Sequence, residues 1–134
     1  MIKTFGAIVM TLLTVLSGMM TTNDVNQYEQ KAQEFYEETQ NSMNEEFDDE
    51  AKGELEKKGV IIESVTVHYE KNSNYDNAYT FRADVKVNGH TVSEILVVDM
   101  ENDDNLEYYG LVDNKLMTAD SEEAAYYREL LSTD

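Results

Sequence analysis

Two histidines and a large number of carboxylates are the side chains in this sequence that acid–base catalysis would use. His68 falls within an expected strand and His90 beside an expected turn, where exposed structural histidines are the usual finding. The 28 aspartates and glutamates are too numerous for any pair of the glycosidase type to be singled out. The sequence contains no glycine-rich phosphate loop, HExxH pair or GxSxG elbow. We therefore expect no catalytic residues and a protein that is not an enzyme.

A cluster of acids around residue 103 is the best candidate for a metal site. The EF-hand loop requires glycine at its sixth position and glutamate at its twelfth. Counted from Asp99, these positions hold Asp104 and Val112, so the pattern fails. The absence of cysteine excludes thiolate zinc sites, disulfides and cysteine nucleophiles. We expect a solvated acidic turn and no metal or cofactor, with a looser cation site as the alternative. The acids of this cluster are Asp99, Glu101, Asp103, Asp104 and Glu107.

The charge of the chain limits its partners. Ten lysines and arginines stand against 28 acids, which gives a formal net charge of −18. A surface of this sign repels nucleic-acid phosphates and anionic lipid head groups. We therefore expect no nucleic-acid partner, and a partner that is basic, neutral or cationic. Acidity that serves solubility alone is the alternative.

The first 22 residues predict the location of the protein. Met1–Thr22 places one lysine before an apolar run, Phe5–Met20, that is followed by small and hydroxyl residues, as in a secretory signal. The run is short for a membrane-spanning helix, which needs about 20 residues. A single anchoring span and a buried core helix are the alternatives. We predict an extracytoplasmic protein, secreted or anchored by residues 1–22, with one acidic domain over residues 23–134.

A short motif in this segment favours a bacterial envelope. Leu16-Ser17-Gly18 resembles the lipobox that precedes the acylated cysteine of bacterial lipoproteins. Met19 occupies the position of that cysteine, so lipid cannot be attached there. A chance match in a stretch rich in leucine, serine and glycine is the alternative.

Asn23–Lys58 has the pattern of a long amphipathic helix, with apolar residues spaced mostly three or four apart. A straight helix of this length would measure about 50 Å, whereas a ten-residue strand measures about 34 Å. We therefore expect the helix to overhang the sheet or to break, with the break at Gln40-Asn41-Ser42. The apolar stripe comprises Val25, Tyr28, Ala32, Phe35, Tyr36, Met43, Phe47, Ala51 and Leu55.

Tyr79–Met100 joins two alternating runs through Asn88-Gly89, which predicts a β-hairpin with a two-residue turn. The resulting register pairs Val87 with His90 and puts nearly every large apolar residue on one face. The remaining elements are expected at Val60–Lys71 (first strand), Leu106–Val112 (fourth strand), Lys115–Thr118 (a short fifth strand or a connection) and Ser121–Leu131 (a C-terminal helix with an Asp120–Glu123 capping box). The predicted class is α+β, with a long N-terminal amphipathic helix packed on a four-stranded antiparallel meander and a short C-terminal helix.

The outer face of the predicted hairpin and one tyrosine doublet form the candidate interaction surface. On a strand, Tyr108-Tyr109 would direct one ring inward and the other outward. Exposed tyrosines anchor many protein interfaces, although they are equally common at the rim of a small core. The candidate interaction residues are Thr80, Arg82, Ile95, Val97, Tyr108 and Tyr109.

The order of export segment, long helix and antiparallel meander resembles cystatin-like and NTF2-like domains over Asn23–Val112, in topology only. Small exported or membrane-anchored proteins of Gram-positive bacteria and their mobile elements are similar. The QxVxG loop of cystatin protease inhibitors is absent, so the resemblance does not imply protease inhibition. The pocket acids and histidines of NTF2-like enzymes cannot be assigned to residues of this chain.

Three functions follow as hypotheses. The first is a non-enzymatic extracytoplasmic protein-binding module of a bacterial cell envelope. The second is an NTF2-like cone that binds a small ligand or acts as an enzyme, with a pocket between helix and sheet. A pocket with two or more converging polar groups would favour this hypothesis, whereas a cone filled by Phe35, Phe47, Phe81 and Leu96 would argue against it. The third is an acidic mimic that inhibits a basic nucleic-acid-binding protein.

Overall fold

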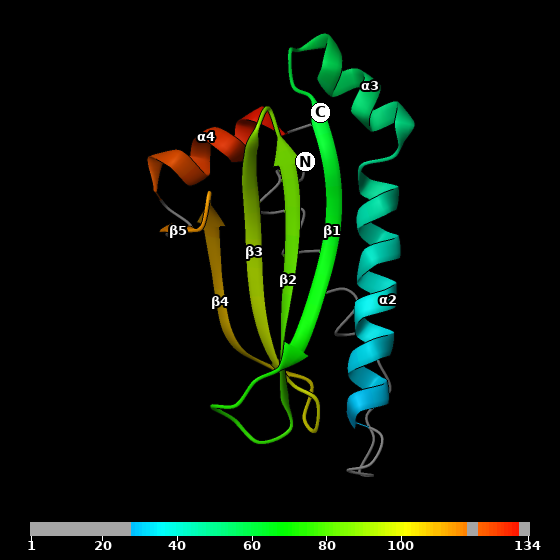
Figure 1. Cartoon of the computed structure of the whole chain (residues 1–134), viewed down its shortest axis with the longest axis vertical. Coiled ribbons are helices and arrows are strands. Elements are labelled where there is room, and N and C mark those ends of the chain that lie inside the picture. The colour runs from blue at the N-terminus through cyan, green and yellow to red at the C-terminus, as the bar shows by residue number, and fades with distance from the viewer. Residues whose placement is uncertain (1–27, 118–120, 132–134) are drawn as a thin grey trace.

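The computed structural model describes residues 28–117 and 121–131 of the chain. In this part of the chain one antiparallel sheet is accompanied by three helices, which confirms the α+β class (Figure 1). The sheet has five strands and not the predicted four, because the segment that was expected either to extend the sheet or to connect does pair with it. In chain order the elements are α2 (Tyr28–Glu46), α3 (Asp49–Lys57), β1 (Ile62–Lys71), β2 (Ala78–Val87), β3 (His90–Asp99), β4 (Asp104–Val112), β5 (Lys115–Met117) and α4 (Glu122–Leu130).

The segment expected to form one long helix is divided at Phe47-Asp48. Asp48 caps α3, because its Oδ1 accepts a hydrogen bond from the Ala51 amide at 2.8 Å. The predicted break at residues 40–42 is wrong, since these residues lie inside α2, where buried Met43 continues the apolar stripe. Residues 23–27 of the predicted helix lie outside the described residues.

The hairpin of β2 and β3 has the predicted register. Pairs run from Val87 and His90 beside the turn to Ala78 and Asp99 at the open end. The turn residues Asn88 and Gly89 both have positive φ, 50° and 83°, as a type I′ turn requires. Every strand pairs with its neighbours in the sequence, so the sheet is a meander.

The Asn88 side chain ties this turn to the connection between α3 and β1. Its Oδ1 accepts a hydrogen bond from the Ile61 amide at 2.8 Å, and its Nδ2 donates to the Gly59 carbonyl at 3.2 Å. The Gly89 amide adds a third bond by donating to Glu63 Oε2 at 3.0 Å. One turn therefore positions both the hairpin and the start of β1.

We expect Asn88→Ala to lower the free energy of unfolding by about 2 kcal/mol. The substitution removes two exposed hydrogen bonds worth about 0.5 kcal/mol each. It also requires alanine to adopt the left-handed backbone conformation, which costs about 1 kcal/mol. Asn88→Gly is the matched control, because glycine tolerates the backbone and only the bonds are lost, at about 1 kcal/mol. Urea unfolding measures both variants. A glycine variant as stable as the natural chain would show that the side-chain bonds contribute nothing.

The core lies between the helices and one face of the sheet. Phe35 of α2 packs on Phe81 of β2 with ring centroids 4.3 Å apart, and α4 adds Ala124 and Tyr127. Phe47 and Leu96 are buried in the same cluster. The four side chains expected to fill a cone therefore do fill the space between α2 and the sheet.

Gln40 protects the edge of the sheet at β1. Its Nε2 donates to the Val65 carbonyl at 3.3 Å and its Oε1 accepts from the Val67 amide at 2.9 Å, as a neighbouring strand would do. Figure 1 shows α2 running beside β1 in the position that this contact requires. At the opposite edge β5 pairs only with the last three residues of β4, and a bulge at Leu106 interrupts β4. Both features disfavour the addition of another chain at an edge.

Two predictions concern the ends of the chain: the cap of the C-terminal helix and the N-terminal signal or anchor. Ser121, not Asp120, is the N-cap of α4, since its Oγ accepts from the Ala124 amide at 3.1 Å; Asp120 lies outside the described residues. No helix in residues 28–117 or 121–131 combines the length and apolarity needed to cross a membrane. The predicted signal or anchor, residues 1–22, also lies outside the described residues.

Candidate functional site

The face of the sheet that points away from the core is organised in rows of side chains that cross the strands. We call it the outer face. Strand pairing places one residue from each of β1, β2, β3 and β4 in each row. The rows are Thr66–Asp84–Ser93–Leu111, His68–Arg82–Ile95–Tyr109 and Glu70–Thr80–Val97–Glu107.

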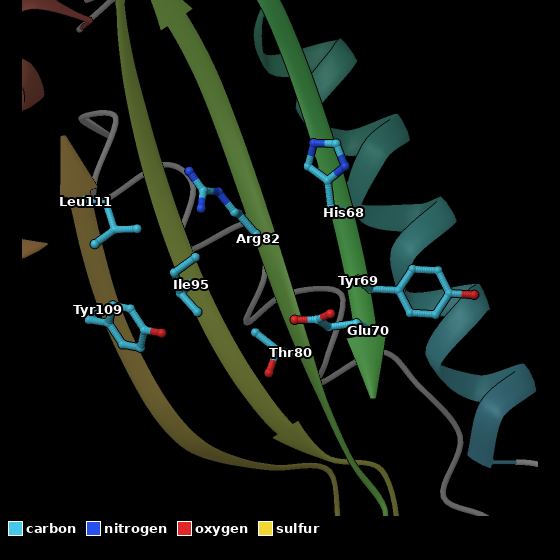
Figure 2. Close-up of a pocket in the computed structure, with 8 residues that line it drawn as sticks. All are labelled: His68, Tyr69, Glu70, Thr80, Arg82, Ile95, Tyr109 and Leu111. Carbon is cyan, nitrogen blue, oxygen red and sulfur yellow. The ribbon is translucent and has the colours of Figure 1, made fainter. Parts of the chain in front are cut away.

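A groove of about 360 Å³ crosses this outer face (Figure 2). The whole middle row lines it, together with Glu70, Thr80, Leu111 and Tyr69. Ile95 lies in its floor and is only 4% exposed, whereas the Tyr109 ring beside it is 37% exposed. Figure 2 shows the Tyr69 ring turned toward α2, where its centroid lies 5.0 Å from that of Tyr36. The accessible surface of the groove is therefore formed by the Tyr109 ring and by polar side chains above the buried Ile95.

Arg82 is fixed in the groove by hydrogen bonds to three residues. Its Nε donates to Asp84 Oδ1 at 2.8 Å. Its Nη2 donates to Ser93 Oγ at 3.2 Å and to Asn114 Oδ1 at 2.8 Å. The side chain remains 33% exposed, so the guanidinium forms a preorganised cation at one end of the groove.

Ser93, Asp84 and His68 have the residue types of a hydrolase triad but not its arrangement. Ser93 Oγ donates to Asp84 Oδ1, and His68 Nε2 lies 3.5 Å from the other oxygen of the same carboxylate. In a triad the imidazole takes the proton of the hydroxyl, which requires the histidine to contact the serine. Ser93 is also fully buried. Asp84 and Ser93 therefore hold Arg82 in place, and the three residues do not form an activated nucleophile.

His90, the second histidine, connects two turns. Its Nδ1 lies 2.7 Å from Asp113 Oδ2, and Asp113 Oδ1 accepts from the Thr91 amide at 2.9 Å. The hydrogen bond with His90 and then the one from Thr91 lower the pKa of the Asp113 carboxyl. The contact holds the β2–β3 turn against the β4–β5 turn, which is a structural role.

The acidic turn after β3 uses its carboxylates locally. Asp99 Oδ1 accepts from the Glu101 amide at 2.9 Å, and Asp99 Oδ2 accepts from Asn102 Nδ2 at 3.0 Å. Asp103 forms an ion pair with Lys31 of α2. Among the described residues, no three acids or histidines are grouped so that they could hold a metal ion.

The structure brings most of the candidate interaction residues together. Thr80, Arg82, Ile95 and Tyr109 line the groove. Val97 lies on the outer face in the adjacent row but is buried. Tyr108 differs, since it packs against the core on the opposite face. The doublet thus directs one ring inward and one outward, as expected on a strand.

Glu94 was not singled out in the sequence, although it is an unusual residue. It lies on the core face of β3 between Ala83 and Gly110 and is fully buried. Neither carboxyl oxygen has a hydrogen bond of normal geometry among the described residues, although the Tyr108 hydroxyl lies close enough to favour the ionised form. Burial raises the pKa of Glu94 well above its ordinary value, against smaller lowering effects of Tyr108 and Arg128. The sequence did indicate a buried acid at this position, because the predicted hairpin register pairs Glu94 with Ala83 on the apolar face.

Comparison of the chain with protein-family models, with curated proteins and with solved structures gives no match. The resemblance to cystatin-like and NTF2-like domains therefore stays a prediction from the order of the elements. Functional proposals for this chain rest on the residues of the outer face and of the core.

Proposed function

We propose that this protein is a non-enzymatic, extracytoplasmic binding module of a bacterial cell envelope that docks on another protein through its outer face. The groove is the observation that carries the proposal. Buried Ile95, the exposed Tyr109 ring and the fixed Arg82 guanidinium lie side by side there. Aromatic rings and arginines next to an apolar floor are the typical anchors of protein interfaces.

The closed edges of the sheet support docking through a face. Gln40 occupies backbone groups of β1 that an added strand would use. The bulge at Leu106 and the short strand β5 make the other edge irregular. A partner that recognises this sheet would therefore contact side chains of the outer face rather than extend the sheet.

Photo-crosslinking in intact cells tests the docking function. A photoreactive residue at position 109 should give one defined protein adduct, because this ring borders the groove. The same residue at position 38, on the exposed side of α2, is the control and should give none. Adducts of equal yield from both positions, or none from position 109, would contradict docking through the outer face.

The pattern of residues 1–22 supports the extracytoplasmic location. Cell fractionation combined with N-terminal sequencing tests it. We expect the protein in the extracytoplasmic or membrane fraction, with a new N-terminus if the segment is a cleaved signal. An intact Met1 in the soluble cytosolic fraction would contradict export.

An NTF2-like cone that binds a ligand is a second candidate, and Glu94 is the observation that favours it. Its carboxyl, with Tyr108 and Arg128 nearby, forms a polar centre within the core. The aromatic packing of Phe35 on Phe81 opposes it, because these rings occupy the space beneath α2. Saturable one-to-one binding of the neutral dye Nile red to the folded protein would support the cone. No binding would remove this candidate.

A further inference from the structure

We propose that the outer face takes an extended, basic segment of its partner, in which two lysines or arginines flank an apolar residue at alternate positions. This inference rests on the docking function proposed above and adds the chemistry of the partner. It follows from the charges that the outer face leaves unbalanced and from the distance between them.

The unbalanced charges are Glu70 and Glu107, the two ends of one cross-strand row. Both are exposed, and neither forms an ion pair within the described residues. The Arg82 charge, in contrast, is balanced by Asp84 at 2.8 Å. Lys86, the other cation of this face, lies three rows away beside the hairpin turn. A partner that covers this row therefore meets two acids, within a protein of net charge −18.

The distance between these two acids matches the spacing of side chains in an extended peptide segment. Glu70 is on β1 and Glu107 on β4, so three gaps between strands of about 4.8 Å separate their backbones by about 14 Å. An extended chain advances about 6.7 Å for every two residues, so the side chains of residues i and i+4 lie on one side about 13 Å apart. Lysines at these two positions would meet the two acids when the segment crosses the strands.

The residue between the two lysines then faces the apolar part of the row. Position i+2 lies over Thr80 and Val97, and the exposed ring of Tyr109 in the adjacent row is the accessible apolar surface beside it, since Val97 and Ile95 are buried. An apolar side chain there would pack against the Tyr109 ring at the side of the groove and exclude water from the space between the two ion pairs, which strengthens them. A second copy of this chain fits poorly, because its own surface carries the same strong negative charge.

Defined peptides provide the test. The parent peptide is Gly-Ser-Lys-Ser-Leu-Ser-Lys-Ser-Gly with blocked ends. One control replaces leucine by serine, and the other moves the second lysine one position nearer, which turns it to the opposite side. In an amide-shift titration of the isotope-labelled protein, we expect the parent to bind at least tenfold more tightly than either control. The largest shifts should occur at Glu70, Thr80, Val97 and Glu107, the four residues of the row, and at Tyr109. Equal affinity of the three peptides would overturn the inference.

Charge variants distinguish binding at this row from nonspecific attraction between a basic peptide and an acidic protein. Glu70→Lys combined with Glu107→Lys should weaken binding of the parent peptide at least tenfold. Glu38→Lys combined with Glu45→Lys, two exposed positions on α2, makes the same change in net charge and should weaken binding less than twofold. Equal losses would overturn the inference. In cells, a partner crosslinked at position 109 that lacks such a segment would overturn it and leave docking intact, whereas no adduct would refute docking itself.

Discussion

Glu94→Gln is expected to stabilise the protein by an amount that grows as the pH rises above 4.5, the ordinary pKa of a glutamate. Glutamine keeps the shape of the side chain and cannot ionise. In the folded state, burial raises the pKa of the Glu94 carboxyl well above its ordinary value, by more than the Tyr108 hydroxyl and the Arg128 charge lower it. Unfolding exposes the carboxyl to water, where it ionises at a lower pH.

The sign of this pH dependence follows from the raised pKa. Below pH 4.5 the carboxyl is protonated in both states, and Glu94 contributes no pH dependence. Between 4.5 and the raised pKa of the folded state, unfolding releases a proton, so the natural chain loses about 1.4 kcal/mol of stability for each pH unit. The difference between the variant and the natural chain should therefore widen at that rate and level off above the raised pKa.

Urea unfolding at a series of pH values measures this difference. Taking the difference cancels the contributions of the other acids, which are shared by both chains. Glu38→Gln, at an exposed position on α2, is the control and should give a small offset that does not change with pH. Parallel stability curves for the Glu94→Gln variant and the natural chain would show that Glu94 is ionised in the folded state.

Asp103→Asn is expected to cost about 3 kcal/mol, because it leaves the buried Lys31 ammonium without its counter-charge. Lys31 is only 5% exposed. Its Nζ donates to the Met100 carbonyl at 3.0 Å and pairs with Asp103, so α2 is joined to the turn after β3. The remaining carbonyl contact cannot neutralise the ammonium, and water has little access to it.

A double-mutant cycle measures this interaction. Lys31→Met and Asp103→Asn are made singly and together, and each variant is unfolded in urea. The double variant should cost less than the sum of the single variants, because it buries no isolated charge. Glu54→Gln is the control, since it breaks the exposed pair with Lys57 and should cost less than about 0.5 kcal/mol. Additive costs at Lys31 and Asp103 would contradict a coupled buried pair.

The sheet could be predicted because its signals are local. Asn88-Gly89 fixes the turn type, and the turn type fixes which residues of β2 and β3 face each other. The two-residue period of a strand then separates the inward ring of Tyr108 from the outward ring of Tyr109. The same reasoning places Thr80, Arg82, Ile95 and Val97 on one face of the sheet from the sequence alone.

The features that were missed depend on contacts between distant residues. Asn114 reaches Arg82 from the β4–β5 turn, and no sequence pattern relates these two residues. The break was expected at Gln40-Asn41-Ser42, but Gln40 lies inside α2, where it donates to Asn44 in its own helix and also contacts the edge of β1. The break falls at Asp48 because its side chain accepts from the Ala51 amide and so caps the start of a second helix, which outweighs a run of weak helix formers. The sequence therefore predicts which residues share the outer face, but not the hydrogen bonds that connect them to distant parts of the chain.

The meander has a consequence for the order in which the chain acquires structure. Each strand lies beside the one synthesised just before it, so the sheet forms through contacts that are close in sequence and therefore fast. The contacts of α2, in contrast, join residues that are distant in sequence. Phe35 is synthesised well before Phe81, on which it packs. We expect α2 to be among the last elements to dock, although it is made before the sheet, with its apolar stripe uncovered in the meantime. A chain that leaves a ribosome or a membrane pore from its N-terminus would expose that stripe until β2 has emerged, which makes α2 the natural contact point for a chaperone.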